Sequence, residues 1–249
     1  MASTSSCSSP YLSGYGLNYL IDIENAVIVD VEPTPARTYD EVEATKTMLE
    51  RTERRLHLKP KRLAADTAYG TGRFLGWLIG HRIAPHIPVR DAGERDDGTF
   101  SRSDFRWDRR RGIYVCPNNK VLHTTGTVYD GTLLRYRASK FDCDVCPLKM
   151  KCCPNTSARH VPRDLQEDAR DVARRLMRTN VFIKSRDERK RVEMRFAHLK
   201  THHGFERMRL RGLSGARDEF HLAAIAQNLK TLALRAIGPP PNQRHVSLA

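Results

Sequence analysis

Residues 61–72, KRLAADTAYGTG, place an acid at the end of a short apolar run, with a glycine-bearing turn behind it. The run KRLAAD predicts a buried strand that ends at Asp66. RFLGWLIG at 73–80 then predicts a short helix, and IAPHIPV at 83–89 predicts the next strand. This strand–helix–strand order favours an α/β fold in which Asp66 lies at a strand end.

The preceding segment, LNYLIDIENAVIVDVEPTPAR at 17–37, predicts a β-hairpin. Its apolar runs Tyr19–Ile23 and Ala26–Val31 flank a short turn, and the prolines that follow predict the end of the second strand. A helix is expected at 38–58. The order up to Val89 is therefore β-β-α-β-α-β, a mixed α/β pattern around one sheet.

Two later stretches look like strands joined by turns, FRWDRRRGIYVCP at 105–117 and VLHTTGTVYDGTLLRYRAS at 121–139. Helical patterns resume at 162–179, and DEFHLAAIAQNLKTLALRAI at 218–237 is apolar on most sides, as in a buried helix. We therefore expect five parts: a disordered N-terminus at 1–16, the first part of the main domain at 17–91, a β-rich insertion at 92–160, a helical remainder at 161–238 and a tail at 239–249.

The charge of the chain favours a polyanionic partner. Its 249 residues include 43 Lys and Arg against 29 Asp and Glu, which gives a formal net charge of +14. The excess is concentrated at 183–217, with 11 basic and 4 acidic residues. Nucleic acid is favoured over a membrane surface, because no basic stretch has a clean apolar side. The sequence has neither a run of about 18 apolar residues nor a signal-peptide pattern, so we expect a cytoplasmic protein without a membrane partner.

Two acids are candidates for metal-assisted chemistry: Asp66, and Glu193 in the basic segment RVEMRFAHLK at 191–200. At helical spacing, Arg189, Glu193 and Lys200 share one side of a helix, so one acid lies between two bases. An Asp at a strand end and a Glu on a neighbouring helix can hold the divalent cations used in phosphoryl transfer on DNA. The alternatives are a turn-capping role for Asp66 and a solvated salt-bridge stripe around Glu193.

Four cysteines gather at 143–153, and Cys116 lies on the preceding hairpin. In a cytoplasmic protein this spacing favours metal binding or free thiols over disulfides. A C-x2-C pair, a third loop cysteine and one remote cysteine can supply the four thiolates of a structural zinc site. The predicted ligands are Cys116, Cys143, Cys146 and Cys152, with Cys153 spare. The alternative is a set of reduced cysteines in a small core.

The sequence around these candidates resembles a known family. ADTAYGT at 65–71 resembles the motif around the second catalytic Asp of bacterial insertion-sequence transposases with an RNase H-like DDE domain, of the IS4/IS5 superfamily and nearest the IS1182 group. Arg189, Glu193 and Lys200 fit the spacing of the family's last helix motif, although Arg186 stands where that motif has Tyr. CPLKMKCCPN and GARDEFHLAAIAQNLKTLA resemble the same group.

The resemblance covers most of the chain and implies an RNase H-like mixed sheet with flanking helices, interrupted by the cysteine-containing insertion. It implies a DNA transposase that cleaves its element's ends and joins them to target DNA with Mg²⁺ or Mn²⁺, and a dimer assembled on DNA. It also implies that Asp66 and Glu193 hold the metal and that Arg189 and Lys200 bind DNA phosphates.

One departure concerns the first catalytic Asp, which the family carries on its first strand in a DGT- or DST-like motif. The opening MASTSSCSSPYLSGYG has no acid, and Asp22 and Asp30 stand on or beside what look like the second and third strands. We therefore expect an N-terminally truncated transposase with two of three metal carboxylates, which binds DNA without cleaving it. The rival interpretations are a catalytically inactive DNA-binding relic and a host nuclease on the same fold.

Overall fold

The computed structural model describes residues 2–7, 14–35, 40–90, 93, 95–203 and 208–237, with the backbone alone at 2–7, 191 and 194–203. The chain divides into two compact units, and each is described by itself. Unit 1 comprises residues 1–70, 77–88 and 173–249, and unit 2 comprises residues 71–76 and 89–172. No helix of the described chain is both long and apolar enough to cross a membrane.

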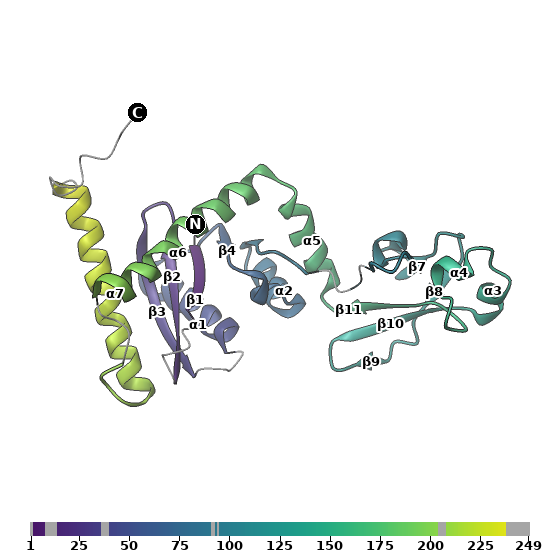
Figure 1. Cartoon of the computed structure of the whole chain (residues 1–249), viewed down its shortest axis with the longest axis horizontal. Helices are drawn as coiled ribbons and strands as arrows, with labels where there is room; N and C mark the ends of the chain where they lie inside the picture. The colour runs from purple at the N-terminus through teal and green to yellow at the C-terminus, as the bar shows by residue number, and fades with distance from the viewer. Residues whose placement is uncertain are drawn as a thin grey trace. The chain divides into compact units, whose positions relative to one another are not determined.

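Unit 1 is built on a five-stranded mixed sheet in the order β3-β2-β1-β4-β5 (Figure 1). The strands are β1 (Ala2–Cys7), β2 (Tyr15–Asp22), β3 (Val27–Pro35), β4 (Arg62–Ala64) and β5 (Ala84–His86). Strand β2 pairs antiparallel with both β1 and β3, whereas β4 runs parallel to both β1 and β5. The central position therefore belongs to β1, between β2 and β4.

Two strand expectations need correction. We expected residues 1–16 to be disordered, but Ala2–Cys7 form the central strand, while 8–13 lie outside the described residues. The segment ASTSSC has no hydrophobic alternation, and pairing on both sides determines its conformation. The second correction concerns β3, which continues through Pro33 and Pro35 instead of ending before them. Proline is tolerated there because β3 is an edge strand.

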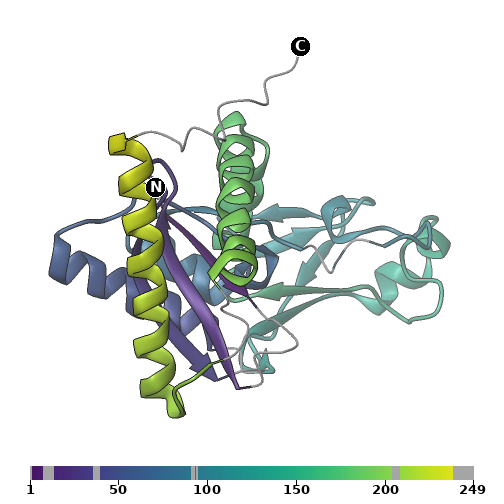
Figure 2. The same ribbon diagram turned by 60° about the vertical axis from the view of Figure 1, so that its left-hand side comes forward.

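Helices cover both faces of this sheet, and Figures 1 and 2 show α1 and α7 on opposite sides of β2 and β3. Helix α1 (Glu41–Leu56) buries Met48 and Leu49 on one face. On the other face lie α6 (Asn180–His203) and α7 (Gly212–Ile237). Alternate residues of β2 enter a core cluster there with side chains of both helices, which comprises Leu17, Tyr19, Ile21, Val192, Phe220 and Ala224 among others.

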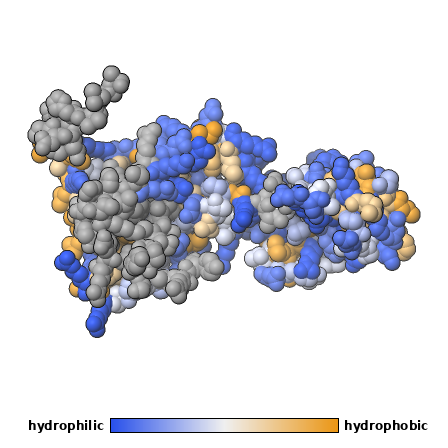
Figure 3. All heavy atoms as spheres, viewed as in Figure 1, coloured by the Kyte–Doolittle hydropathy of each residue, from blue (hydrophilic) through white to orange (hydrophobic). Residues whose placement is uncertain are grey.

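Helix α7 corrects the expectation of a helix buried on most sides. Phe220 and Ala224 are buried against the sheet. The opposite stripe is apolar but open to solvent: Leu222 is 64% exposed and Leu229 is 60% exposed. Figure 3 shows hydrophobic side chains at the surface along α7, on the left. The uniform hydrophobicity of the sequence therefore concealed a helix with one covered and one open face.

Unit 2 contains a six-stranded antiparallel sheet in the order β11-β10-β8-β7-β6, with β9 paired to β10. The strands are β6 (Arg106–Asp108), β7 (Ile113–Val115), β8 (Val121–His123), β9 (Val128–Tyr129), β10 (Leu133–Ala138) and β11 (His160–Asp164). We expected a helical pattern from residue 162, but β11 pairs with β10 up to Asp164, and helix α5 begins only at Glu167. Pro162, which resembled the start of a helix, lies within an edge strand.

The remaining helices of the chain are short. They are η1 (Thr67–Tyr69), α2 (Gly72–Gly80), η2 (Arg102–Asp104), α3 (Lys140–Asp144), α4 (Lys149–Cys152) and α5 (Glu167–Met177). In unit 2, Trp107, Tyr114 and Tyr136 pack ring against ring, and the buried Arg163 guanidinium lies 3.9 Å from the centre of the Trp107 ring. This aromatic core fixes the sheet on which the cysteine-containing segment rests.

Candidate functional site

Asp66 follows β4 and begins the turn η1. Its backbone is extended, with φ −80° and ψ −179°, and its Oδ1 accepts a hydrogen bond from the Ala68 amide at 2.9 Å. The turn-capping role that we considered is therefore present. The half-buried carboxylate forms no ion pair with a described residue. Capping uses one oxygen and leaves the second oxygen available for a ligand.

The turn behind Asp66 is anchored by its own sequence. The Tyr69 side chain is fully buried. A Cβ atom on Gly70 would lie 2.6 Å from the carbonyl oxygen of Pro88, so only glycine fits without displacement of the backbone. These two residues hold the end of β4, and with it the Asp66 backbone, in place.

Glu193 lies on α6 at the surface of the sheet. Its neighbour Val192 is buried in the core cluster, whereas the Glu193 side chain is 39% exposed. The Glu193 Oε1 lies 2.7 Å from Nη1 of Arg189, one helical turn earlier, and the Arg189 side chain is only 17% exposed. The salt-bridge alternative is therefore also present, in a partly buried form.

Helix α6 crosses the strands of the sheet (Figure 1). Ser185 contacts His86 on β5, and one turn later Glu188 lies 3.9 Å from Arg62 at the start of β4. Val192 then shares the core cluster with Ala64 of β4 and with side chains of β2. The helix therefore passes over β4 close to the middle of its described length.

This arrangement places Asp66 and Glu193 on elements that pack together. Asp66 lies two residues beyond Ala64, the last residue of β4, and Glu193 follows Val192 directly. Side chains of a strand alternate, so extended backbone continued through Ala65 would place Asp66 on the same side as Ala64. Lys200 belongs to the same helix, but its side chain lies outside the described residues. The predicted proximity of the two carboxylates stays a prediction.

A buried histidine fastens α6 to the sheet. His86 Nδ1 on β5 lies 2.6 Å from the Ser185 hydroxyl, which itself donates to the Val181 carbonyl. Since the hydroxyl has a single hydrogen, His86 Nδ1 donates the hydrogen bond to Ser185 Oγ. Burial, and next the positive charge of Arg62, lower the pKa of His86 to about 4, so the ring is neutral near pH 7.

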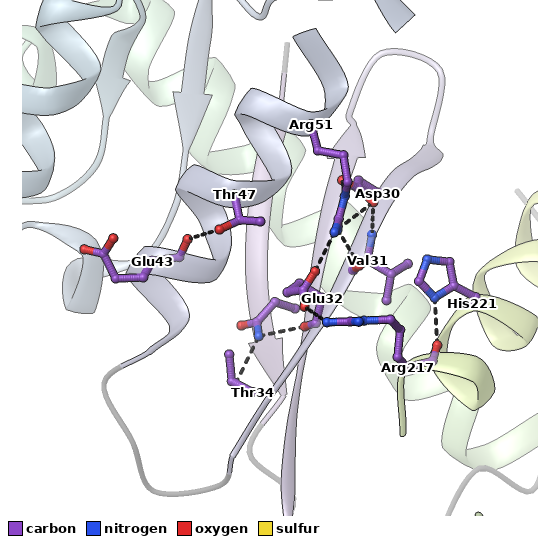
Figure 4. Close-up of polar contacts among 10 residues, drawn as sticks. Asp30, Val31, Glu32, Thr34, Glu43, Thr47, Arg51, Arg217 and His221 are labelled. Carbon is purple, nitrogen blue, oxygen red and sulfur yellow. Dashed lines mark hydrogen bonds and ion pairs between the residues drawn. The ribbon is translucent and has the colours of Figure 1, made fainter. Parts of the chain in front are cut away.

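Asp30, one substitute considered for the missing acid, is already engaged (Figure 4). Arg51 of α1 donates to both Asp30 carboxylate oxygens, at 2.7 and 3.0 Å, and to Glu32 at 2.7 Å. Glu32 also accepts from Arg217 at 2.6 Å. The hydrogen bonds to Asp30 and Glu32, and the charges of these two acids, raise the pKa of Arg51, although burial opposes them and is the largest single effect. These acids neutralise the partly buried guanidinium of Arg51 and are not free to bind a metal ion.

Asp22, the other substitute, lies at the wrong place along the sheet. Its register partner on β1 is Ala2, which pairs in turn with Leu63, three residues before Asp66. That offset alone is about 10 Å along the strands. The Asp22 carboxylate also accepts hydrogen bonds from the Glu24 amide and the Asn25 side chain. Asp22 therefore stabilises the β2–β3 turn.

All five cysteines of unit 2 line a single cavity of about 20 Å³. Cys116 follows β7, and the others lie on or beside α3 and α4. Asn118 Nδ2 lies 3.5 Å from Cys146 Sγ, which joins the β7–β8 turn to the α3–α4 segment. Burial, and next the neighbouring Cys153, raise the pKa of Cys152 to about 12. Cys116 therefore lines the same cavity as the four later cysteines, Cys153 included, whereas the predicted tetrahedral grouping of the sulfurs stays a prediction.

One residue of this cavity escaped the sequence analysis. Arg159 is only 5% exposed and donates to the carbonyls of Cys152 at 3.0 Å and Phe100 at 2.8 Å. No carboxylate among the described residues forms an ion pair with it. An arginine in a polar, basic chain carries no sequence signal of burial, so its position depends on the tertiary fold.

The donors present fit a single hard cation better than a bridged pair. Among the described residues, no three His, Cys, Asp or Glu side chains are already grouped as a metal site. Asp66 and Glu193 offer two carboxylates, and Mg²⁺ accepts one or two carboxylates when water and phosphate oxygens complete its shell. Two closely spaced ions need further acidic ligands.

Comparison with known protein families gives one match. Residues 115–233 match the family model described as transposase DDE domain. The matched range includes the cysteine cavity, Arg189 and Glu193, but begins after Asp66. No curated protein and no solved structure shows significant similarity to the chain.

Proposed function

We propose that this chain is an insertion-sequence transposase of the DDE type, with DNA as its substrate. The observation that carries the proposal is the match of residues 115–233 to the transposase DDE domain, with Glu193 inside the matched range. The mixed five-stranded sheet with helices on both faces supports the RNase H-like fold that the resemblance implies. The motifs around Asp66 and Glu193 support the assignment to the IS4/IS5 superfamily, nearest the IS1182 group.

Asp66 and Glu193 are the proposed metal ligands. Asp66 contributes a carboxylate whose backbone is fixed by a strand and a capped turn. Glu193 contributes a second carboxylate from α6, and its pairing with Arg189 is partly exposed. Bound Mg²⁺ or Mn²⁺ would activate the attacking oxygen and stabilise charge on the leaving oxygen. When a cation occupies Glu193, Arg189 becomes available to a DNA phosphate, and Lys200 is proposed to act with it.

A second candidate, a DNA-binding protein without catalysis, is favoured by the composition of β1. The resemblance places the first catalytic Asp on the first strand, and β1 contains only Ala, Ser, Thr and Cys. Asp22 and Asp30 are both engaged elsewhere. Two carboxylates attract Mg²⁺ weakly, whereas a two-ion mechanism needs metals held within about 0.5 Å of the productive geometry. We therefore expect this chain to bind DNA without cleaving it.

DNA binding is tested by fluorescence anisotropy with duplexes from the DNA that flanks the gene. We expect affinity to fall steeply with salt, because each phosphate neutralised releases counterions. Arg209 and Arg211 lie exposed in the basic segment 183–217. Replacing both with Ala should weaken binding and flatten the salt slope by about 2. The matched control replaces the exposed Arg54 and Arg55 of α1, which removes the same charge outside that segment.

Cleavage is tested with Mn²⁺ and supercoiled DNA that carries the flanking sequences. The informative variant is Asp66→Asn, because Asn retains the turn cap and removes the charge. Nicking that Asp66→Asn abolishes would establish the active transposase and refute the inactive candidate. DNA binding without nicking is the result expected for the chain alone. Failure to bind DNA at low salt would refute both candidates. Light scattering on the bound complex tests the proposed dimer on DNA.

A further inference from the structure

We propose that unit 2 binds one structural Zn²⁺ through cysteine thiolates. The site is the cysteine lobe, defined as residues 116–120 together with 139–159. Three ligands are Cys116, Cys143 and Cys146, and the fourth comes from the adjacent Cys152 and Cys153. The proposal is independent of the proposed function, since it concerns what holds this lobe together.

Convergence of the cysteines is the first observation. They come from the end of β7 and from two short helices after β10, yet they line the same cavity. Two sulfur atoms also accept hydrogen bonds: Cys116 Sγ from the Lys120 amide at 3.3 Å, and Cys146 Sγ from Asn118 at 3.5 Å. Hydrogen bonds to sulfur of this kind commonly orient the ligands of metal sites.

In the cysteine lobe, large apolar side chains face solvent and cysteines face inward. Helix α3 has 5 residues and α4 has 4, too few to be stable without tertiary support. The large apolar side chains of this segment point to solvent, with Phe141 85%, Val145 84% and Met150 77% exposed. The inward positions are taken by cysteines: Cys143, Cys152 and Cys153 are buried at the edge of the aromatic core cluster of unit 2. Short segments that bury few large apolar side chains of their own are commonly held by disulfides or metals, and all five cysteines are free.

Charge supplies a third, independent observation. Lys120 and Lys149 line the cavity but already pair with Asp142 and Asp144, at 3.2 and 2.7 Å. Arg159 lines the same cavity and is buried; the charge of Asp97 acts on it from nearby, but no described carboxylate forms an ion pair with it. A buried guanidinium without a counter-ion is costly. Zn²⁺ with four thiolates has a net charge of −2 and would provide that counter-ion.

The volume of the cavity limits the size of what it can bind. A volume of about 20 Å³ accommodates one small particle, comparable to one water molecule. A single ion therefore fits. Four sulfur ligands around one ion are typical of zinc at about 2.3 Å. The side chains are not yet gathered on one point among the described residues, so binding requires the thiols to turn into the cavity they line.

The first test is the metal content of the intact chain. The protein is purified without a polyhistidine tag, added metal or chelator, and we expect about one zinc per chain by elemental analysis. A mercurial thiol reagent should release this zinc, detected with a chromogenic chelator. After exchange with Co²⁺, thiolate-to-cobalt charge-transfer bands are expected. Absence of both zinc and these bands, or recovery of iron in its place, would overturn the proposal.

Variants then locate the site. Cys116→Ser with Cys146→Ser should reduce bound zinc to less than about a tenth, and Cys152→Ser with Cys153→Ser should do the same. The matched control is Cys7→Ser, since Cys7 belongs to β1 and not to the cavity. Zinc retained in full by either double variant would overturn the assignment. Because metal content and the cobalt spectrum are measured on the unmodified chain, the proposal remains testable even if a variant fails to fold.

Discussion

Arg189 Nη1 and Glu193 Oε1 lie 2.7 Å apart on successive turns of α6. This contact explains how one acid is retained in a strongly basic segment, because the helix supplies its own counter-ion. It also means that a cation can reach Glu193 only by displacing or sharing Arg189. Metal binding and phosphate binding are then coupled through one side chain.

The first prediction concerns Glu193→Gln. Because the ion pair is partly exposed, its loss should change the free energy of unfolding by less than about 1 kcal/mol. The affinity for Mn²⁺, measured by electron paramagnetic resonance, should fall at least about tenfold if Glu193 is a ligand. The control is Asp187→Asn on the same helix, which breaks the 3.1 Å pair with Arg186. Equal loss of Mn²⁺ affinity in both variants would exclude Glu193 as a specific ligand.

A second prediction concerns Arg51→Ala. This variant leaves the Asp30 side chain, which is 12% exposed, without its ion pair, whereas Glu32 retains its pair with Arg217. Truncation of one partner of a buried ion pair costs about 3–5 kcal/mol. Urea unfolding should reveal this loss, whereas Arg54→Ala, exposed on the same helix, should stay within about 0.5 kcal/mol. A small effect of Arg51→Ala would mean that solvent replaces the network.

The third prediction is a pH dependence from His86. Its folded pKa of about 4 lies below the ordinary histidine value of 6.5. The folded state therefore favours the neutral ring, and the associated stability is complete above pH 6.5 and is lost as the pH falls towards 4. The loss should approach about 3 kcal/mol. Urea unfolding across this range should show a weaker pH dependence for His86→Gln. An identical profile for both proteins would contradict the prediction.

The fourth prediction compares two glycines. In Gly70→Ala the new methyl group meets the Pro88 carbonyl oxygen at 2.6 Å, and backbone must move. We expect a loss of about 1–3 kcal/mol in the free energy of unfolding. Gly80→Ala, at the end of α2, meets nothing within 4 Å and should be neutral or stabilising by up to about 1 kcal/mol. Equal changes in the free energy of unfolding for both variants would show that the close approach of Gly70 to the Pro88 carbonyl does not require glycine.

Much of the fold could be predicted where hydrophobic periodicity exists. The β2–β3 hairpin, β4, α2 and β5 all carry apolar runs bounded by turn residues, and the structure confirms them. Strand β1 could not be found in this way, because Ser and Thr give no alternation and only pairing with β2 and β4 specifies it. Strand β11 was missed because Pro162 and the acids after it imitate a helix start.

Some features of the candidate site could be predicted from the sequence and others could not. The end of an apolar run located Asp66 at a strand end, and cysteine spacing anticipated the common cavity. The path of α6 across the sheet could not be derived, since it depends on contacts such as His86 with Ser185, which are distant in sequence. The same holds for Arg159, whose burial is set by tertiary packing alone.

The central place of β1 has a consequence for folding on the ribosome. β1 is synthesised well before its parallel partner β4, which begins only at Arg62, and α6 and α7, which cover one face of the sheet, follow unit 2 along the chain. Unit 2 has strands that pair with near neighbours along the chain, and such local topologies fold faster. Until α6 and α7 emerge, the β2 side chains of Leu17, Tyr19 and Ile21 lack their cover. Unit 1 is therefore the part of the nascent chain most exposed to aggregation.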